Sequence, residues 1–324
     1  MKQIYGIDLS KEKFDVNFLS SNNKAKSIIV KNNLNGIVTF LEKLSKDDML
    51  CVEHTGVYGD LLLFLSNCLN IPISISSGYE IKHSLGLLKG KSDKIDAQRI
   101  REYGERFYDK LKTFKYPDEE MKELKELYNM RSQLVKERKM LITHQKGKSH
   151  MAYNSIKANE ISQGVVRSLD KAIEDLEIEI LAIVMSKNEL KTNYNLVKSI
   201  KGIGQVTACD LIVKTGNFKE IDTARKAASY AGVCPFPNSN GKMVKKSRVS
   251  NMADKELKSL LYLCSVVAVS FNPEYKLYHL RKKQEGKPYF LIMNNVANKL
   301  LRTVYSIINS GKEYTFGYIT IDLY

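Results

Sequence analysis

Two acidic residues stand at the ends of apolar segments that have the pattern of buried strands. Asp8 comes late in IYGIDL and would share one strand face with Ile4 and Gly6, and Glu53 ends the segment MLCVE. An ionised carboxylate in a central strand is costly unless it is paired or binds a cation. Because strands of one sheet can end side by side, the two carboxylates can converge on one point.

A second pair of acids lies in KSDKIDAQRI, residues 91–100, where Asp93 and Asp96 are three positions apart. That spacing puts both side chains on one face of a helix. Four carboxylates are then available around one point, and sites rich in carboxylate oxygens suit Mg²⁺ or Mn²⁺. The pattern therefore predicts a divalent-metal site at Asp8, Glu53, Asp93 and Asp96.

Three of these acids also have a simpler structural role open to them. Asp8 could end a strand, Glu53 could pair with a lysine, and Asp93 could cap the N-terminus of a helix. Any one of these motifs alone is weak evidence for a metal. Their order gives more support, because a strand-end Asp, a strand-end Glu and a helical Asp pair follow one another in a single α/β segment.

Cationic residues gather in AGVCPFPNSNGKMVKKSRVSN, residues 231–251, and no acid follows them until Asp254. Such a run can hold a phosphodiester and stabilise the negative charge that develops when it reacts. A solvated loop that only touches DNA is the alternative. The predicted phosphate contacts are Lys242, Lys245, Lys246 and Arg248.

The segment GIGQVTACDLI, residues 202–212, is typical of a helix-hairpin-helix. Gly202 and Gly204 permit a tight turn, and the backbone N–H groups at the start of the next helix can bind a phosphate. A contact of this kind reads no base sequence. We therefore predict DNA binding without sequence preference at these two glycines.

The hydrophobic periodicity predicts three successive parts. Residues 1–110 alternate short β-rich runs with helical segments, which indicates a mixed sheet that opens with a three-strand meander and has helices packed on it. Two long, highly charged helical patterns, residues 118–153 and 165–191, favour an antiparallel coiled-coil arm that turns near residues 153–164, with two helices of a compact bundle as the alternative. Residues 200–324 read as mostly helical, interrupted by the basic segment as a loop.

The composition favours a nucleic-acid partner. Among 324 residues there are 51 Lys and Arg against 36 Asp and Glu, a formal charge of +15, although a basic protein with a merely solvated surface would look the same. The five cysteines never form C-x-x-C and the histidines lack ligand spacing, which argues against zinc and disulfides and predicts a reduced, cytoplasmic protein. No apolar run approaches the roughly 20 residues of a membrane span.

Three N-terminal motifs, GIDLSKEKFDV, VEHTGVYG and KSDKIDAQRI, resemble those of the Asp-Glu-Asp-Asp insertion-sequence transposases, which are relatives of the Piv and MooV site-specific invertases. The segments IKGIGQVTACDLI, ASYAGVCPFPNSNG and KSRVSNMADKELKSLLY are similar to the C-terminal transposase domain of that family. The resemblance runs in order over nearly the whole chain. It implies an α/β plus α architecture, with an RNase H-like domain of the RuvC type at residues 1–112, a coiled-coil arm at 113–198 and a mostly helical transposase domain at 199–324.

The resemblance also implies roles for particular residues. The four carboxylates would bind Mg²⁺ or Mn²⁺, and a serine in the C-terminal segment would attack DNA. In PNSNG the matching serine is Ser239, which Asn240 separates from Gly241. If the essential serine of the family is instead the residue directly before the glycine, this chain has Asn240 at that position. Ser247 and Ser250 are the further candidates.

By the same resemblance we expect a bacterial transposase or recombinase that acts as a homo-oligomer on element ends and target DNA. A structured guide RNA is expected to direct it, and its place of action would be the cytoplasm, at the nucleoid. A plain metal-dependent nuclease of the RuvC type and a non-catalytic nucleic-acid-binding protein of a mobile element are the alternative functions. A covalent protein–DNA adduct separates a recombinase from a nuclease, and any metal-dependent activity separates both from a scaffold.

Overall fold

The computed structural model describes residues 3–315 apart from 55, 85, 87–89, 91, 149, 154, 241 and 242, and for residues 236–248 it describes the backbone alone. The chain divides into two compact units, Met1–Pro117 and Asp118–Tyr324. None of the described helices is both long enough and apolar enough to cross a membrane.

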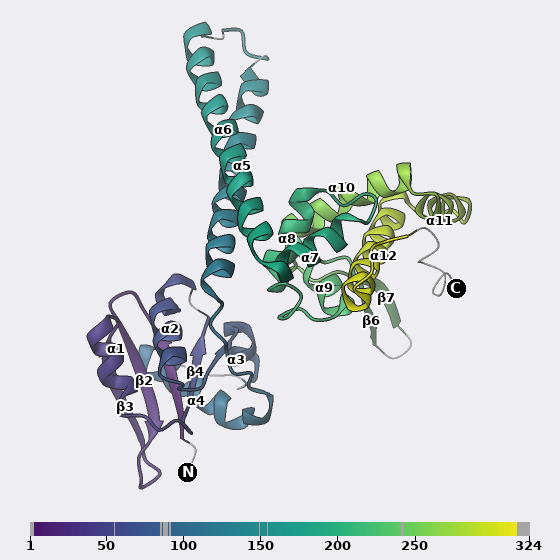
Figure 1. The fold of residues 1–324 in the computed structure, drawn as a ribbon. Coiled ribbons are helices and arrows are strands. Elements are labelled where there is room, and N and C mark those ends of the chain that lie inside the picture. The colour runs from purple at the N-terminus through teal and green to yellow at the C-terminus, as the bar shows by residue number, and fades with distance from the viewer. Residues whose placement is uncertain are drawn as a thin grey trace. The chain divides into compact units, whose positions relative to one another are not determined.

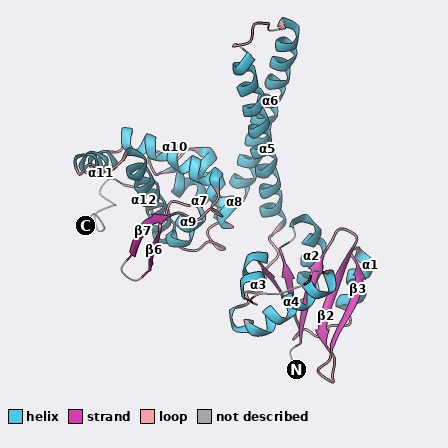
Figure 2. Cartoon of the chain, turned by 180° about the vertical axis from the view of Figure 1, so that it is seen from behind, coloured by secondary structure: helices cyan, strands magenta, loops and turns pink. Residues whose placement is uncertain are grey.

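The N-terminal unit is built on a five-stranded mixed sheet (Figure 2). The first three strands form an antiparallel meander, as the sequence predicts, and the last two join the other side of β1 in parallel. The strand order is therefore β3-β2-β1-β4-β5, with β1 at the centre. The strands are β1 Ile4–Leu9, β2 Lys13–Leu19, β3 Ala25–Lys31, β4 Met49–Glu53 and β5 Ile73–Ser76.

Helices pack on both faces of this sheet. They are α1 Leu34–Leu41, α2 Asp60–Cys68, α3 Gly78–Ser84 and α4 Asp93–Arg106, with short 3₁₀ turns η1 at Gly56–Gly59 and η2 at Tyr108–Lys110. One core joins the sheet to α1 and α2, with Ile7 and Leu50 fully buried. The other joins β1 and β4 to α3 and α4, with Cys51 and Ile100 buried in it. Because side chains alternate along a strand, β1 contributes to both cores and is covered on both faces.

The start of α4 is set by Ser92. The Ser92 hydroxyl accepts a hydrogen bond from the backbone N–H of Ile95 at 3.3 Å, which makes it the N-cap of the helix. The possible N-cap role of Asp93 is therefore wrong. Asp93 and Asp96 both lie in the first turn of α4, where the exposed N–H groups favour negative charge.

The C-terminal unit begins with two long helices that lie side by side, α5 Glu119–Lys148 and α6 Ile156–Ser186 (Figure 1). Their base belongs to the core of this unit, because Leu124 on α5 and Val184 on α6 are fully buried. Toward the other end the apolar side chains of Met140 and Ile156 are exposed. Packing of these helices as a coiled coil remains a prediction.

The remaining elements surround one helical core. They are α7 Asn188–Lys198, α8 Gln205–Thr215, α9 Ala224–Tyr230, β6 Phe236–Asn240, β7 Met243–Arg248, α10 Lys255–Phe271, α11 Pro273–Gln284 and α12 Tyr289–Ser310. The helix α12 contributes Leu300, Leu301 and Val304 to this core, and all three are fully buried.

Two parts of the chain differ from what the periodicity predicts, the second long helix and the basic segment. The second long helix begins earlier than predicted, at Ile156, and it ends at Ser186, because Lys187 is extended and α7 starts directly after it. The basic segment, predicted as a loop, is an antiparallel hairpin of β6 and β7. Its polar composition gives a weak strand pattern, and the two strands satisfy backbone groups by pairing with each other.

Candidate active site

The sheet brings the first two predicted acids together. Ile7 of β1 is paired with Val52 of β4 in parallel register, so Asp8 and Glu53 come next on neighbouring strands at the same edge of the sheet. Both side chains are partly buried, and both lie on the face that α4 covers. The convergence expected from two acidic strand ends is therefore what this register produces.

Two glycines allow α4 to lie directly on the strands. A Cβ atom at Gly6 of β1 would come within 2.2 Å of the Ala97 carbonyl oxygen on α4. On the other side, a Cβ at Gly104 of α4 would come within 2.5 Å of the Cys51 sulfur on β4. Since neither glycine has a side chain, helix and sheet approach closely enough to bring the first turn of α4 beside Asp8.

A buried arginine fixes the helix in this position. Arg101 is only 5% exposed, and its Nε donates to the side-chain oxygen of Asn17 on β2 at 2.7 Å. Its Nη1 lies 2.5 Å from the Glu105 carboxylate, one turn further along α4. The guanidinium is thus satisfied at both ends, which makes it a rigid link between β2 and α4.

The acids act on one another electrostatically. The pKa of Asp8 is raised to about 6, first by burial and then by repulsion from four other carboxylates, Asp96, Asp93, Glu53 and Asp15. All four predicted acids therefore belong to one cluster. Asp15, which the sequence reasoning missed, is the register partner of Asp8 on β2, and its position in an antiparallel neighbour is the signal that could have found it.

Two cations already pair with the helical acids. The Lys13 ammonium lies 3.5 Å from Asp93 and 3.6 Å from Asp15. The Arg99 guanidinium lies 2.8 Å from Asp96 and donates a second hydrogen bond to the Gly90 carbonyl at 2.9 Å. Neither cation was predicted as part of the site. An arginine at i+3 from Asp96 was a readable signal, whereas the position of Lys13 depends on the sheet.

The Glu53 carboxylate lies against the start of α3. A Cβ at Gly78 would lie 2.1 Å from the Glu53 Oε1 atom, so the carboxylate rests on a position that only glycine leaves open. The next residue, Tyr79, is 59% exposed and its ring lies 4.1 Å from that of His83.

The donor set suits a hard divalent ion, because carboxylate oxygens are the ligands that Mg²⁺ and Mn²⁺ prefer. A cluster whose members raise the pKa of Asp8 by repulsion is also one that a cation would relieve. Within the described part of the chain, however, no three acidic, histidine or cysteine side chains are already arranged around one point as ligands. Asp93 and Asp96 point to Lys13 and Arg99 instead, so these two acids would have to leave their partners to bind an ion.

The predicted glycines lie in the turn between α7 and α8, as a helix-hairpin-helix requires. Gly202 has φ +115°, and a Cβ there would lie 3.1 Å from Ala268 and from the Cys264 carbonyl oxygen on α10. Gly204 is the N-cap of α8 and has no atom within 4 Å of its Cβ position. Gly202 therefore allows the turn to pack closely against α10. At Gly204, by contrast, the space that a Cβ atom would take at the start of α8 is open.

Ser239 lies near the end of β6, where it pairs with Val244 of β7. Lys245, Lys246 and Arg248 are residues of β7, and Lys242 lies outside the described residues. The fallback candidate Ser247 is also on β7, while the hydroxyl of Ser250 accepts a hydrogen bond from the backbone N–H of Met252 at 3.2 Å. The structure thus puts the serine and the basic run on one hairpin.

Both ends of this hairpin are anchored in the helical core. Before it, the Val233 carbonyl accepts a hydrogen bond from the side chain of Asn294 on α12 at 2.8 Å. After it, Asp254 caps α10 by accepting from the backbone N–H of Leu257 at 2.7 Å. These contacts fix where the hairpin leaves and rejoins the core.

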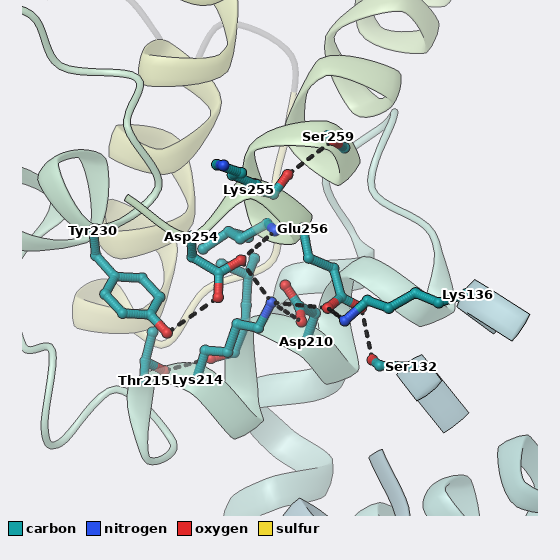
Figure 3. Close-up of polar contacts among 12 residues, drawn as sticks. Ser132, Lys136, Asp210, Lys214, Thr215, Tyr230, Asp254, Lys255, Glu256 and Ser259 are labelled. Atoms are coloured by element: carbon teal, nitrogen blue, oxygen red, sulfur yellow. Dashed lines mark hydrogen bonds and ion pairs between the residues drawn. The ribbon is translucent and has the colours of Figure 1, made fainter. Parts of the chain in front are cut away.

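Asp254 belongs to a polar cluster around Lys214 (Figure 3). The Lys214 ammonium lies 2.8 Å from Asp210 and 3.0 Å from Asp254, and the Tyr230 hydroxyl donates to Asp254 at 3.3 Å. Burial raises the pKa of Asp210, which is fully buried, while the nearby Lys214 counteracts part of that effect. Glu256 reaches across to the Ser132 hydroxyl on α5, which donates to it at 2.6 Å.

Comparison with known proteins gives matches over both halves of the chain. A family model described as a transposase, that of the DEDD transposases of IS110, matches residues 5–148. A second, described as the transposase IS116/IS110/IS902 family, matches residues 194–280. The first range contains all four predicted acids, and the second contains the anchored hairpin.

Relatives agree with these matches, and two of them align over nearly the whole chain. The pilin gene-inverting protein of Moraxella lacunata is 28% identical over 328 residues, which cover 97% of this chain and 98% of that protein. The protein of the same description from Moraxella bovis has the same identity and coverage. An uncharacterized 43.6 kDa protein of insertion element IS110 from Streptomyces coelicolor is 22% identical over 157 residues, 45% of this chain and 39% of that protein. Because two models of one family match in order over the acidic and the serine-bearing segments, the chain belongs to the IS110 family of transposases.

Proposed function

We propose that this chain is the DNA transposase or recombinase of an insertion element, and that it cuts and rejoins DNA strands with a divalent-metal site and a nucleophilic serine. The observation that carries the proposal is the clustering of Asp8, Glu53, Asp93 and Asp96 at one edge of the sheet in a chain of a transposase family. Relatives that align over the whole chain are described as inverting a pilin gene, which favours DNA rearrangement over simple degradation.

We infer an RNase H-like fold of the RuvC type for the N-terminal unit. A three-strand meander, two further strands parallel to β1 and acids at the ends of β1 and β4 support this inference. The four predicted acids would hold Mg²⁺ or Mn²⁺. When bound, such ions activate an attacking oxygen and stabilise the leaving oxygen in phosphodiester chemistry. The chain's own part is to position the carboxylates, and the close packing of α4 on β1 and the Glu53–Gly78 contact support this role.

Ser239 is the proposed nucleophile. Its Oγ attacks the phosphorus of one DNA strand, a Ser–phosphate bond forms as the bond to a deoxyribose oxygen breaks, and the serine proton ends on the departing hydroxyl. The phosphodiester energy is retained in the Ser–phosphate bond, so a second DNA hydroxyl can reverse the step and rejoin strands. Hydrolysis by water would discard that energy.

The hairpin supports a phosphate-binding role beside the serine. Three of the four predicted cationic residues, Lys245, Lys246 and Arg248, belong to β7, whose partner strand carries Ser239. Cationic side chains near a reacting phosphate stabilise the charge that develops on it. With a net charge of +15, the chain is expected to bind DNA with strong salt dependence.

A homo-oligomer and a structured guide RNA complete the proposal. Strand exchange requires at least two strands to be cut in concert, which calls for more than one active site. The arm of α5 and α6, with exposed apolar residues such as Met140, Ile156 and Ile161, supports self-association. The guide RNA rests on the family resemblance alone.

The test is a trapping experiment on DNA that carries the element's own ends. Wild-type protein with Mg²⁺ should give a covalent protein–DNA species on a denaturing gel, and Ser239 should be found in the DNA-linked peptide. Asp8→Asn should abolish cleavage while the protein still binds DNA. Ser239→Ala should lose the adduct, and Ser250→Ala, the matched control, should keep it.

The other outcomes identify the alternatives. An adduct that persists in Ser239→Ala places the nucleophile elsewhere, with Ser247 tested next. Cleavage by wild-type protein that never yields an adduct supports a plain metal-dependent nuclease. Binding without any metal-dependent activity supports a non-catalytic protein of a mobile element.

A further inference from the structure

Lys13 occupies an unusual position between two acids of the cluster. Its ammonium lies 3.6 Å from Asp15, whose side chain is 8% exposed, and 3.5 Å from Asp93, whose side chain is 61% exposed. The lysine therefore bridges the buried edge of β2 and the open first turn of α4. Its ammonium therefore lies beside a carboxylate, that of Asp93, which is open to solvent.

The two cations of the site are held differently. Arg99 lies 2.8 Å from Asp96 and also donates to the Gly90 carbonyl at 2.9 Å, so it is fixed by two close contacts. Both Lys13 distances exceed the 2.7–2.9 Å typical of a close charge-assisted hydrogen bond, by roughly 0.6 Å or more. Its side chain is 44% exposed and sits on a flexible four-carbon stem. Lys13 is thus the cation that can leave at low cost.

Moving Lys13 changes the charge balance of the cluster. Asp8, Asp15, Glu53, Asp93 and Asp96 together carry more negative charge than Lys13 and Arg99 neutralise. A divalent ion on Asp93 would sit close to the ammonium, and the two positive charges would repel. A DNA phosphate that arrives with the ion offers the ammonium a new partner, which removes this conflict.

We propose that Lys13 is an internal counterion of the metal-free site, which competes with the divalent ion for Asp93 and turns to the DNA phosphate when ion and DNA bind together. The inference rests on the proposed metal site. It makes Lys13 a phosphate-binding residue of the centre, and it makes ion and DNA binding mutually reinforcing. By linkage, the factor by which the ion tightens DNA binding equals the factor by which DNA tightens ion binding.

The first measurement is Mn²⁺ affinity without DNA, from the loss of the free Mn²⁺ paramagnetic resonance signal. Lys13→Gln should bind Mn²⁺ about two- to five-fold more tightly than wild type, the scale expected for one exposed charge interaction. Lys13→Arg, which keeps the charge, should stay close to wild type. Lys11→Gln is the matched control, because Lys11 is exposed in the turn before β2 and should leave Mn²⁺ affinity unchanged.

The second measurement is DNA affinity by fluorescence anisotropy, with and without Mn²⁺, on a duplex that cannot be cleaved. In wild type, Mn²⁺ should tighten DNA binding, and in Lys13→Gln this enhancement should be reduced. Lys11→Gln should keep the enhancement even if its overall affinity falls. Equal or weaker Mn²⁺ binding by Lys13→Gln, or an undiminished enhancement, overturns the role of Lys13 while the metal site stands. If wild type binds no Mn²⁺ that depends on Asp8, the proposed site and this inference both fail.

Discussion

Asp8 on β1 and Asp96 on α4 repel each other across the contact between strand and helix, and after burial this repulsion is the largest cause of the raised pKa of Asp8. An acid with a raised pKa binds its proton more tightly in the folded than in the unfolded protein. The ionised Asp8 carboxylate therefore destabilises the folded state, and this destabilisation is complete above a pH of about 6. It decreases as pH falls and is absent below 3.8, the pKa of the unfolded state.

We expect Asp8→Asn to stabilise the metal-free protein. The free energy of unfolding at neutral pH should rise by about 1–2 kcal/mol, a figure reduced for solvent screening because Asp8 is only partly buried. The gain should shrink as pH falls from about 6 to 4, because wild-type Asp8 then becomes protonated as well. Urea unfolding in the presence of a chelator at several pH values measures it. Asp47→Asn, at an exposed site, is the control, and a gain that does not change with pH would contradict the explanation.

Gly6 should tolerate no side chain. Gly6→Ala would place a Cβ 2.2 Å from the backbone of Ala97 and Arg101, which cannot move without lifting α4 from β1. We expect a loss of about 3 kcal/mol or more in unfolding free energy, together with loss of DNA cleavage. Gly164→Ala on α6 is the matched control, because its Cβ would meet no atom within 4 Å and should stabilise that helix by up to about 1 kcal/mol.

The two glycines before α8 should separate stability from DNA binding. Gly202→Ala should lower the unfolding free energy by about 1–3 kcal/mol, because φ is +115° and Ala268 lies 3.1 Å from the new Cβ. Gly204→Ala has open space and φ −89°, so its stability cost should stay below about 1 kcal/mol. If the start of α8 binds a phosphate, Gly204→Ala should still weaken DNA binding equally for unrelated sequences. Equal stability losses in the two variants would show that the packing argument is wrong.

Lys214 should be the most costly lysine to remove. Lys214→Met leaves Asp210 fully buried without its cation, which we expect to cost about 3–5 kcal/mol at neutral pH. The loss should diminish in acid, since Asp210, whose pKa burial already raises, then becomes neutral. Lys226→Met breaks an ion pair of the same spacing with Asp222, but both of its side chains are more than half exposed, so it should cost less than about 1 kcal/mol. Thermal and urea unfolding of both variants across pH tests the difference.

The local sequence was sufficient for the three-strand meander of the N-terminal unit. The strand patterns of IYGIDL, KFDVNFL and AKSIIVK predict the observed meander, because alternation reports which side chains face the core. The acids could be proposed from their places at the ends of two apolar strands and in one helical turn. By contrast, the end of α6 at Ser186 and the pairing of β6 with β7 were missed, because the helical pattern continues past Lys187 and the hairpin pattern is weak.

What the sequence by itself determined is the set of residues on which the proposed chemistry rests: four carboxylates with the spacing of strand ends and a helix turn, a basic run after Ser239, and a large positive charge. What only the tertiary structure decided is which side chains surround those acids and pair with them. Lys13 reaches Asp93 because β2 pairs with β1 and α4 lies on both, and Asp15 joins the cluster through the register of the same strands. These contacts join residues of different strands and helices, and their electrostatic effect depends on distance in space and on burial. Neither quantity can be read from the spacing of residues along the chain.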